Sequence, residues 1–262
     1  MNLVVCVKQT PSSEARVTVA SDGKSIDPAN TEFVINPYDE YAVEEALLAR
    51  EKFGGTITAV TVGPQKSQET LRHCLALGVD RVMMVKAEEL IGADPYGIAS
   101  ILAAAIRPLE ADLILCGKVA IDVENTGTGV ALAELMGLPH VGVASKVEWT
   151  DEKHLKIHRE IEGASELVEL ELPAVVTAEK GLNEPRYPKL PGIMKAKKKP
   201  IEELDAEALA VDPAAVGTAG SGLDVTRMEP PPPRAEGKTF TGEATESVGL
   251  VLAALRDERK LL

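Results

Sequence analysis

The residues with the clearest potential for chemistry lie in one loop, residues 117–129, which reads GKVAIDVENTGTG. The loop follows an apolar run and opens a segment with helical spacing. Glycines let backbone N–H groups approach an anion, hydroxyl groups add donors, and a helix N-terminus favours negative charge. The loop therefore predicts a nucleotide or phosphate site. The alternative is a Thr- or Asn-capped helix start preceded by a flexible loop.

Three further loops belong to the same site if the strands before them are parallel. They are residues 6–8, 36–39 and 62–65, each next to an apolar run or a helix start. Open α/β sheets bind ligands at the carboxyl ends of their strands, where such loops meet. Lys8 is a candidate phosphate partner or simply a solvated lysine, and residues 36–39 are a candidate ligand loop or a cap and turn.

Other chemistry finds little support in the chain. Neither GxGxxG nor GxxxxGK[ST] is present, and the four histidines form no HExxH motif. There is no GxSxG elbow for a serine nucleophile. The three cysteines, Cys6, Cys74 and Cys116, have no CxxC spacing, so neither a disulfide framework nor a zinc site is predicted. We therefore predict no catalytic residue and no metal.

The elements that must position these loops alternate between strand and helix. Near-continuous apolar runs predict buried strands at residues 3–7, 56–62, 81–85 and 112–116. Helical spacing and Pro or Gly at the ends predict helices at residues 38–52, 64–77, 95–107 and 128–136. This order predicts an α/β fold with a doubly wound, mostly parallel sheet and right-handed crossovers.

The chain changes character after residue 140. Partly alternating segments at residues 141–148, 154–160 and 166–170 predict an added antiparallel strand block, and residues 175–177 can rejoin the main sheet. We predict an α/β nucleotide-binding domain at 1–204, including the antiparallel block at about 141–171. Residues 205–262 are predicted as a C-terminal arm, rich in Pro and Gly, that ends in an amphipathic helix at 243–256.

Composition narrows the class of protein. The 262 residues carry a net charge of −13, which argues against general nucleic-acid binding and against adhesion to anionic membranes. No signal peptide is evident, and no apolar stretch reaches the roughly 20 residues that cross a bilayer. We expect a soluble cytoplasmic protein of a bacterium or archaeon, without membrane insertion.

One basic segment stands out against this acidic background. Residues 183–199 combine an NEPRY turn, an apolar set and four lysines within five residues. A compact basic segment on an acidic chain is either a solvated face or a docking surface for a partner.

Several motifs together resemble the β subunit of electron transfer flavoproteins. They are CVKQ (6–9), INPYDEYAVEEAL (35–47), VGPQKSQETLRHCLALGVDR (62–81), GKVAID (117–122), REIEG (159–163) and, most specific, the stretch at 175–199. The resemblance covers nearly the whole chain. It implies a Rossmann-like domain that pairs with an α subunit, which holds most of the FAD. The C-terminal helix, on its long tether, is predicted to pack on the partner subunit, with its own domain as the alternative.

The resemblance also implies a structural AMP in this subunit, so that the chain carries electrons with its partner and catalyses no bond chemistry. The AMP-binding residues it implies are Cys6, Asn36, Pro37, Tyr38, Asp39, Val62, Gly63, Gly117, Asp122, Asn125, Thr126, Gly127 and Thr128. One departure is the Ser12-Ser13-Glu14 sequence, where some members of the family have a tyrosine near the flavin; Tyr38 is the substitute candidate.

For residues 183–199, the resemblance implies docking of acyl-CoA dehydrogenases, with Leu190 as anchor and a quinone oxidoreductase as the electron acceptor. The implied docking residues are Leu190, Ile193, Met194, Lys195, Lys197, Lys198 and Lys199. Glu160 resembles a glutamate that contacts the swinging FAD domain; an exposed strand charge is the alternative.

Two alternatives to this carrier function stay open. In an electron-bifurcating enzyme, the pocket holds a second FAD, which NADH reduces, in place of AMP. Bifurcating members resemble GDTAQVGP after the aspartate at 122, whereas this chain has VENTGTG at 123–129, which favours AMP. The other alternative is a nucleotide-binding scaffold without a redox role.

Overall fold

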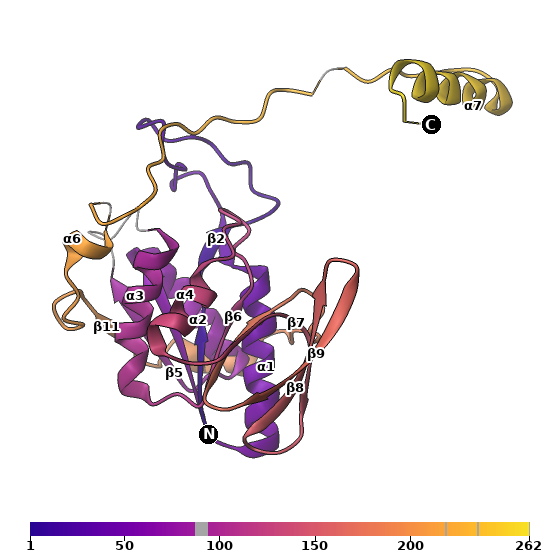
Figure 1. The fold of residues 1–262 in the computed structure, drawn as a ribbon. Coiled ribbons are helices and arrows are strands. Elements are labelled where there is room, and N and C mark those ends of the chain that lie inside the picture. Colours follow the sequence, from indigo (N-terminus) through magenta and orange to yellow (C-terminus); the bar gives the residue numbers. More distant parts are fainter. Residues whose placement is uncertain (87–93, 218, 235, 262) are drawn as a thin grey trace. The chain divides into compact units, whose positions relative to one another are not determined.

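The computed structural model describes residues 1–86, 94–217, 219–234 and 236–261. Within these residues, nine strands form one sheet in the order β11-β5-β4-β1-β6-β10-β7-β8-β9 (Figure 1). The strands from β11 to β7 pair in parallel, and β8 and β9 extend the sheet as antiparallel neighbours of β7. Their bounds are β1 (Asn2–Cys6), β4 (Thr56–Gly63), β5 (Arg81–Lys86), β6 (Leu113–Gly117), β7 (His140–Trp149), β8 (His154–Ile161), β9 (Ala164–Glu171), β10 (Ala174–Ala178) and β11 (Glu202–Leu204).

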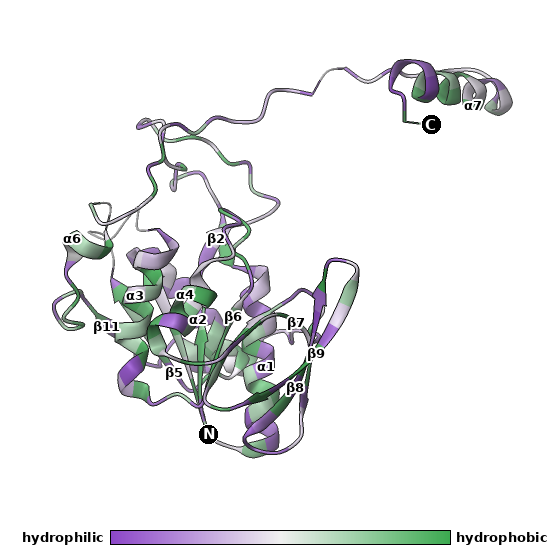
Figure 2. Ribbon diagram, viewed as in Figure 1, coloured by the Kyte–Doolittle hydropathy of each residue, from purple (hydrophilic) through white to green (hydrophobic). Residues whose placement is uncertain are grey.

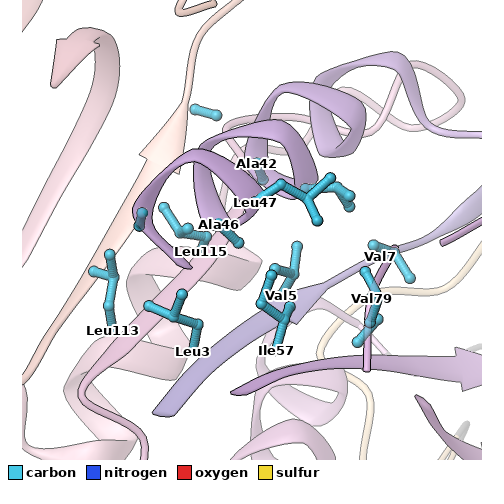
Figure 3. Close-up of a cluster of buried hydrophobic side chains, with 14 of the residues drawn as sticks. Leu3, Val5, Val7, Ala42, Ala46, Leu47, Ile57, Val79, Leu113 and Leu115 are labelled. Atoms are coloured by element: carbon cyan, nitrogen blue, oxygen red, sulfur yellow. The ribbon is translucent and has the colours of Figure 1, made fainter. Parts of the chain in front are cut away.

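Helices cover both faces of the parallel region, as near-continuous apolar strands require. Along β1, Leu3 and Val5 face α1 (Pro37–Phe53) and α2 (Gln68–Leu77), and Figure 3 shows Ala42, Ala46 and Leu47 of α1 in the same cluster of buried side chains. Val4 and Cys6 face the opposite way, toward α3 (Pro95–Ile106) and α4 (Thr128–Met136). The doubly wound, Rossmann-like α/β fold with an antiparallel block is thus confirmed. In Figure 2 the strands at the centre of the sheet are coloured as largely hydrophobic.

The strand order reverses between β1 and β6. From β1 the chain moves outward to β4 and β5, and then returns through α3 to β6 on the other side of β1. Cys6 and Cys116, at the carboxyl ends of these two strands, are partners in the register. Such a reversal opens a crevice beyond the carboxyl ends of the strands, where open α/β sheets bind ligands.

Local sequence signals set the ends of the helices that flank this crevice. Asp94 caps α3, because its Oδ1 accepts a hydrogen bond from the Gly97 N–H at 2.8 Å. Helix α4 ends at Gly137, whose φ of 69° lies in the left-handed region that glycine adopts at little cost. The predicted helix at 128–136 is therefore confirmed at both ends.

Some short elements lie outside the predicted set. Before α2 the chain makes a 3₁₀ turn, η1 (Gln65–Ser67), so the predicted helix at 64–77 starts later as an α-helix. A small ribbon joins β2 (Gln9–Pro11) to β3 (Phe33–Ile35), and α3 runs into a second 3₁₀ turn, η3 (Arg107–Leu109). Helix α5 (Leu190–Ala196) lies in the basic segment.

The contacts divide the described chain into two units, Met1–Met228 and Glu229–Leu262. Residues just beyond 204 belong to the first unit, because Leu209, Val211 and Val216 pack against the core under α3. Val216 lies in the short helix α6 (Pro213–Val216). The second unit contains α7 (Ala244–Ala253) and a π-helical turn, η4 (Ala254–Glu258).

Residues 218, 235 and 262 of the predicted arm lie outside the described residues. Among the helices that the structure does describe, none has the length and apolar character needed to cross a membrane.

Candidate functional site

A cavity of about 270 Å³ lies at the reversal of strand order, beyond the carboxyl ends of β1 and β6. Four of the predicted loops meet there. The predicted residues that line it are Cys6, Asn36, Asp39, Val62, Gly117, Asn125, Thr126 and Thr128. The crevice inferred from strand order thus brings together residues from four separate parts of the sequence.

Asp39, in the first turn of α1, fixes the two central strand ends. Its Oδ2 accepts a hydrogen bond from the Lys8 N–H at 2.7 Å, and its Oδ1 accepts one from the Gly117 N–H at 2.9 Å. The residue is 5% exposed. Burial raises the pKa of this carboxyl to about 7, because the loss of hydration outweighs the hydrogen bonds that favour the carboxylate.

The neighbouring loop is held by Asn36, which is also buried. Its Nδ2 donates to the carbonyl of Val119 at 2.9 Å, and its Oδ1 accepts from the Ile121 N–H at 3.3 Å. Gly117 has no room for a side chain, since a Cβ there would lie 2.4 Å from Asp39 Oδ1. The glycine is therefore required by the close approach of strand β6 to α1.

The N-terminus of α4 faces the cavity through Thr128 and Gly129. Gly127 occupies the cap position, and no side chain caps this helix. The structure therefore differs from the Thr- or Asn-capped start that was the alternative reading of the loop. Uncapped N–H groups at a helix start, together with the helix dipole, favour an anionic ligand.

Part of the cavity lining is apolar, and the sequence reasoning did not find it. Pro95, Ile98 and Leu102 of α3 and Leu132 of α4 form it. The contribution of α3 to this lining could have been predicted in part, because Ile98 and Leu102 are four residues apart on a helix that follows a parallel strand. A cavity with one apolar wall and one row of backbone donors suits a flat heterocycle attached to an anion.

Charged side chains gather beside the cavity. Lys8 Nζ forms an ion pair with Asp122 at 2.7 Å, which ties the loop after β1 to the loop after β6. Lys118 pairs with Glu179, and its Nζ lies 5.7 Å from the centre of the Tyr38 ring. Each lysine therefore has a carboxylate partner in this structure.

The other predicted binding residues lie next to the cavity without lining it. Asp122 and Tyr38 make the contacts just described. Gly63 abuts Ser67, whose Oγ would lie 2.6 Å from a Cβ at position 63. Pro37 is the first residue of α1, and Gly127 occupies the cap position of α4. These residues shape the loops.

The basic segment forms a second candidate site on the other side of α1 and α2. The Arg186 guanidinium binds Glu44 of α1 through two nitrogens, at 2.8 Å each, and pairs with Glu51 at 2.5 Å. Asn183 donates to the carbonyl of Tyr41 at 3.1 Å. The NEPRY turn is therefore fastened to α1 by a bidentate charged pair.

Helix α5 follows this turn and packs closely on α2. A Cβ at Gly192 would lie 2.4 Å from the carbonyl oxygen of Ala76, so only glycine permits this approach. The outer surface is apolar: Leu190 is 72% exposed and Met194 is 55% exposed, with Ile193 beside them. We call this surface the α5 platform.

The lysines at the end of the α5 platform differ from one another. Lys195, Lys197 and Lys198 are exposed. Lys199 is half-buried, and its Nζ donates to the carbonyls of Val79 and Asp80 at 3.1 and 3.2 Å. Lys199 is therefore held against the body of the domain.

Glu160 lies elsewhere, near the end of β8, where it is exposed and faces Ser165 of β9 in the register. It is not brought near the cavity lining.

Known proteins resemble this chain along its length. A family model described as "Electron transfer flavoprotein domain" matches residues 25–209. The chain is 41% identical over 263 residues to the electron transfer flavoprotein subunit beta of Bacillus subtilis, with 100% of both chains covered. Identity is 36% over 250 residues to that of Thermoanaerobacterium thermosaccharolyticum, with 95% of each covered. The mitochondrial subunit beta of Oryza sativa subsp. japonica is 37% identical over 268 residues, with 100% of each covered.

Proposed function

The chain belongs to the electron transfer flavoprotein family as a β subunit, and we propose that it pairs with an α subunit and holds one AMP in the cavity between β1 and β6. In this proposal the heterodimer accepts electrons from acyl-CoA dehydrogenases and passes them to a quinone oxidoreductase. We propose the cytoplasm of a bacterium or archaeon as its location; two of the relatives named above are bacterial.

The observation that carries the AMP assignment is the presence of two chemically different groups in the cavity lining. Ile98, Leu102 and Leu132 offer an apolar wall for the adenine. The uncapped start of α4 offers backbone N–H groups for the phosphate. The volume of about 270 Å³ lies at the lower end for ligand pockets, which supports a mononucleotide over a dinucleotide.

AMP would serve as a structural ligand in this site. It would join the loop at 117–128 to the ends of β1 and α1, which Asp39 and Asn36 already link by hydrogen bonds. FAD, shared with the α subunit, supplies the electron-carrying chemistry when bound. Tyr38, half-buried beside the cavity, is our candidate for an aromatic contact with that flavin, since Ser12-Ser13-Glu14 offers none.

The α5 platform is proposed as the surface that docks the dehydrogenase. Leu190 and Met194 would supply an apolar anchor, while Lys195, Lys197 and Lys198 would steer the encounter with an acidic partner. The Arg186–Glu44 pair supports this assignment, because it holds the segment in one conformation before docking.

Contacts with the α subunit are proposed for two further regions. Val248, Leu250, Val251 and Leu252 of α7 are at least 40% exposed, and such a face suits burial against a partner subunit. Glu160 is proposed to contact the FAD domain of the α subunit, supported by its exposure at the end of β8.

Anaerobic reduction of the flavin tests the carrier function. We would co-express the chain with its α subunit and follow the flavin absorbance after adding an acyl-CoA with its dehydrogenase, or NADH alone. Reduction by the acyl-CoA system and none by NADH is the expected result. Rapid reduction by NADH would contradict the proposal and favour the bifurcating enzyme, and reduction by neither would leave the carrier function without support.

A further inference from the structure

Two cysteines lie side by side in the floor of the cavity. Cys6 of β1 and Cys116 of β6 are partners in the parallel register. Both line the cavity, both are free thiols, and each is 8% exposed. They belong to the same core cluster, so their side chains leave the sheet on the same face. The floor of the cavity is therefore a dithiol.

A small molecule would reach the two sulfurs through the cavity, which both cysteines line. The backbone of Gly129 packs close to Cys116 Sγ, since a Cβ at position 129 would lie 2.9 Å from the sulfur, and Gly129 lines the same cavity. The third cysteine, Cys74 of α2, is 0% exposed and belongs to the core cluster on the other face of the sheet. Cys74 thus provides an internal control with the same chemistry and no access.

We propose that Cys6 and Cys116 form a dithiol site for trivalent arsenicals, a class of neutral, soft electrophiles. With an arsenic(III) oxide, two S–H bonds and the arsenic–oxygen bonds break, and two As–S bonds form. The two protons leave with the oxygen as one molecule of water. Arsenic stays trivalent and both sulfurs keep their oxidation state, so the reaction needs no oxidant.

The spacing of the strands favours this bridge over a direct disulfide. Side chains that leave neighbouring strands in register on the same face keep about the strand spacing of roughly 4.8 Å between their Cβ atoms, whereas a disulfide needs Cβ atoms roughly 3.5–4.5 Å apart. An arsenic atom between the two sulfurs lengthens the bridge and spans the wider gap without moving the central strands.

The burial of the thiols separates this reaction from ordinary alkylation. Burial raises the pKa of Cys116 to about 12 and also raises the pKa of Cys6, so neither forms much thiolate at neutral pH. Alkylating agents, which need the thiolate, should therefore react slowly. Two adjacent neutral thiols remain able to condense with an arsenic(III) oxide.

The bridge and a nucleotide would occupy the same cavity, so each should exclude the other. This mutual exclusion rests on the proposed AMP site, whereas the dithiol itself rests only on the positions of Cys6 and Cys116.

The test uses the full chain, stripped of nucleotide and checked for its absence, with phenylarsine oxide as probe. We expect one phenylarsine per chain, a fall from three thiols to one when thiols are counted in the unfolded chain after removal of free probe, and peptide mapping of the bridge to Cys6 and Cys116. Cys116→Ser should abolish the bridge, and Cys74→Ser should retain it. No bridge in the stripped wild-type chain, or a bridge that includes Cys74, would overturn the proposal; the mapping on wild type does not depend on how the variants fold.

A second measurement tests the dithiol site and the AMP assignment independently of each other. AMP at about ten times its dissociation constant should slow bridging about tenfold. Bridging that maps to Cys6 and Cys116 but proceeds at the same rate with AMP would support the dithiol and contradict AMP in this cavity.

Discussion

The carboxylate of Asp39 accepts a hydrogen bond from the backbone N–H of Gly117 at 2.9 Å, which joins the first turn of α1 to the end of β6. The other carboxylate oxygen accepts from the Lys8 N–H, just beyond β1. One buried side chain therefore holds both strand ends at the point where the strand order reverses.

Replacing Asp39 by alanine should damage both stability and nucleotide retention. The substitution removes the acceptor for two backbone N–H groups in a buried setting, at a cost of roughly 2–4 kcal/mol in the free energy of unfolding. Urea unfolding measures this loss, and AMP retained through gel filtration measures the second effect. Glu40→Ala, at the next position of α1, is the matched control, because Glu40 pairs only with the partly exposed His73 among the contacts described. Equal losses in both variants would contradict the role given to Asp39.

The pH dependence of stability should carry the signature of Asp39. Burial raises its pKa to about 7 in the folded chain, against about 4 in the unfolded chain. Between these two pKa values the folded state therefore binds more protons than the unfolded state. The contribution of Asp39 protonation to the free energy of unfolding is fully present below pH 4 and is lost as the pH rises to 7. The slope is at most ~1.4 kcal/mol per pH unit. The difference in the free energy of unfolding between wild type and Asp39→Asn, measured in urea, isolates this contribution. A difference that stays constant from pH 4 to 7 would contradict the raised pKa of Asp39.

Leu190→Ala should weaken docking without weakening the fold. The side chain is 72% exposed, so the free energy of unfolding should change by less than about 0.5 kcal/mol. Loss of an interface anchor costs about 2 kcal/mol, which is roughly a 30-fold rise in the concentration of heterodimer needed for half-maximal reduction by the dehydrogenase. Leu167→Ala, on β9 and 56% exposed, is the control. A rise of the same size in that variant would show that the α5 platform is not the surface that docks the dehydrogenase.

The lysines of the basic segment should separate into two classes. Lys195, Lys197 and Lys198 are exposed, and their replacement by Gln should slow association with the dehydrogenase and flatten its dependence on salt. Lys199→Gln should instead lower stability by about 1 kcal/mol, because its ammonium group binds two backbone carbonyls. Stopped-flow kinetics at several salt concentrations and urea unfolding distinguish the classes. Identical behaviour of the two sets of variants would show that the ammonium of Lys199 is not anchored in solution.

Arg186→Gln should loosen the α5 platform. Its partner Glu44 has a side chain only 6% exposed, so the substitution leaves a buried carboxylate without its cation and costs roughly 1–3 kcal/mol. Arg81→Gln is the control, because Arg81 and Glu202 are both about half exposed and such pairs contribute less than about 1 kcal/mol. Urea unfolding gives both values. A loss in Arg186→Gln no larger than in the control would show that the pair does not hold the segment.

Much of the fold could be predicted because its strands are long apolar runs. Leu3 to Val7 and the run before Gly117 signal buried parallel strands, and parallel strands bring the loops after them to one edge. The convergence of Cys6, Asp39 and Gly117 on one cavity follows from that topology.

The remaining parts depend on contacts between distant positions that have no local pattern. Strand β11 is three residues long and acidic, and only its pairing with β5 makes it a strand. Arg186 and Glu44 are 142 positions apart, and the charge of each is also consistent with a solvated surface. Likewise, nothing in the lysine run marks Lys199 as the member that turns inward.

The nucleotide content of the purified heterodimer tests whether the cavity between β1 and β6 holds AMP. We would denature the complex and quantify the released nucleotides by chromatography, with Gly129→Val as a matched variant. A side chain at position 129 would crowd Thr177 and Cys116, whose atoms lie 2.6 and 2.9 Å from a Cβ there, at the start of α4. We expect one FAD and one AMP per wild-type heterodimer, with AMP lost and FAD retained in the variant. Two FAD and no AMP in the wild type would contradict this assignment.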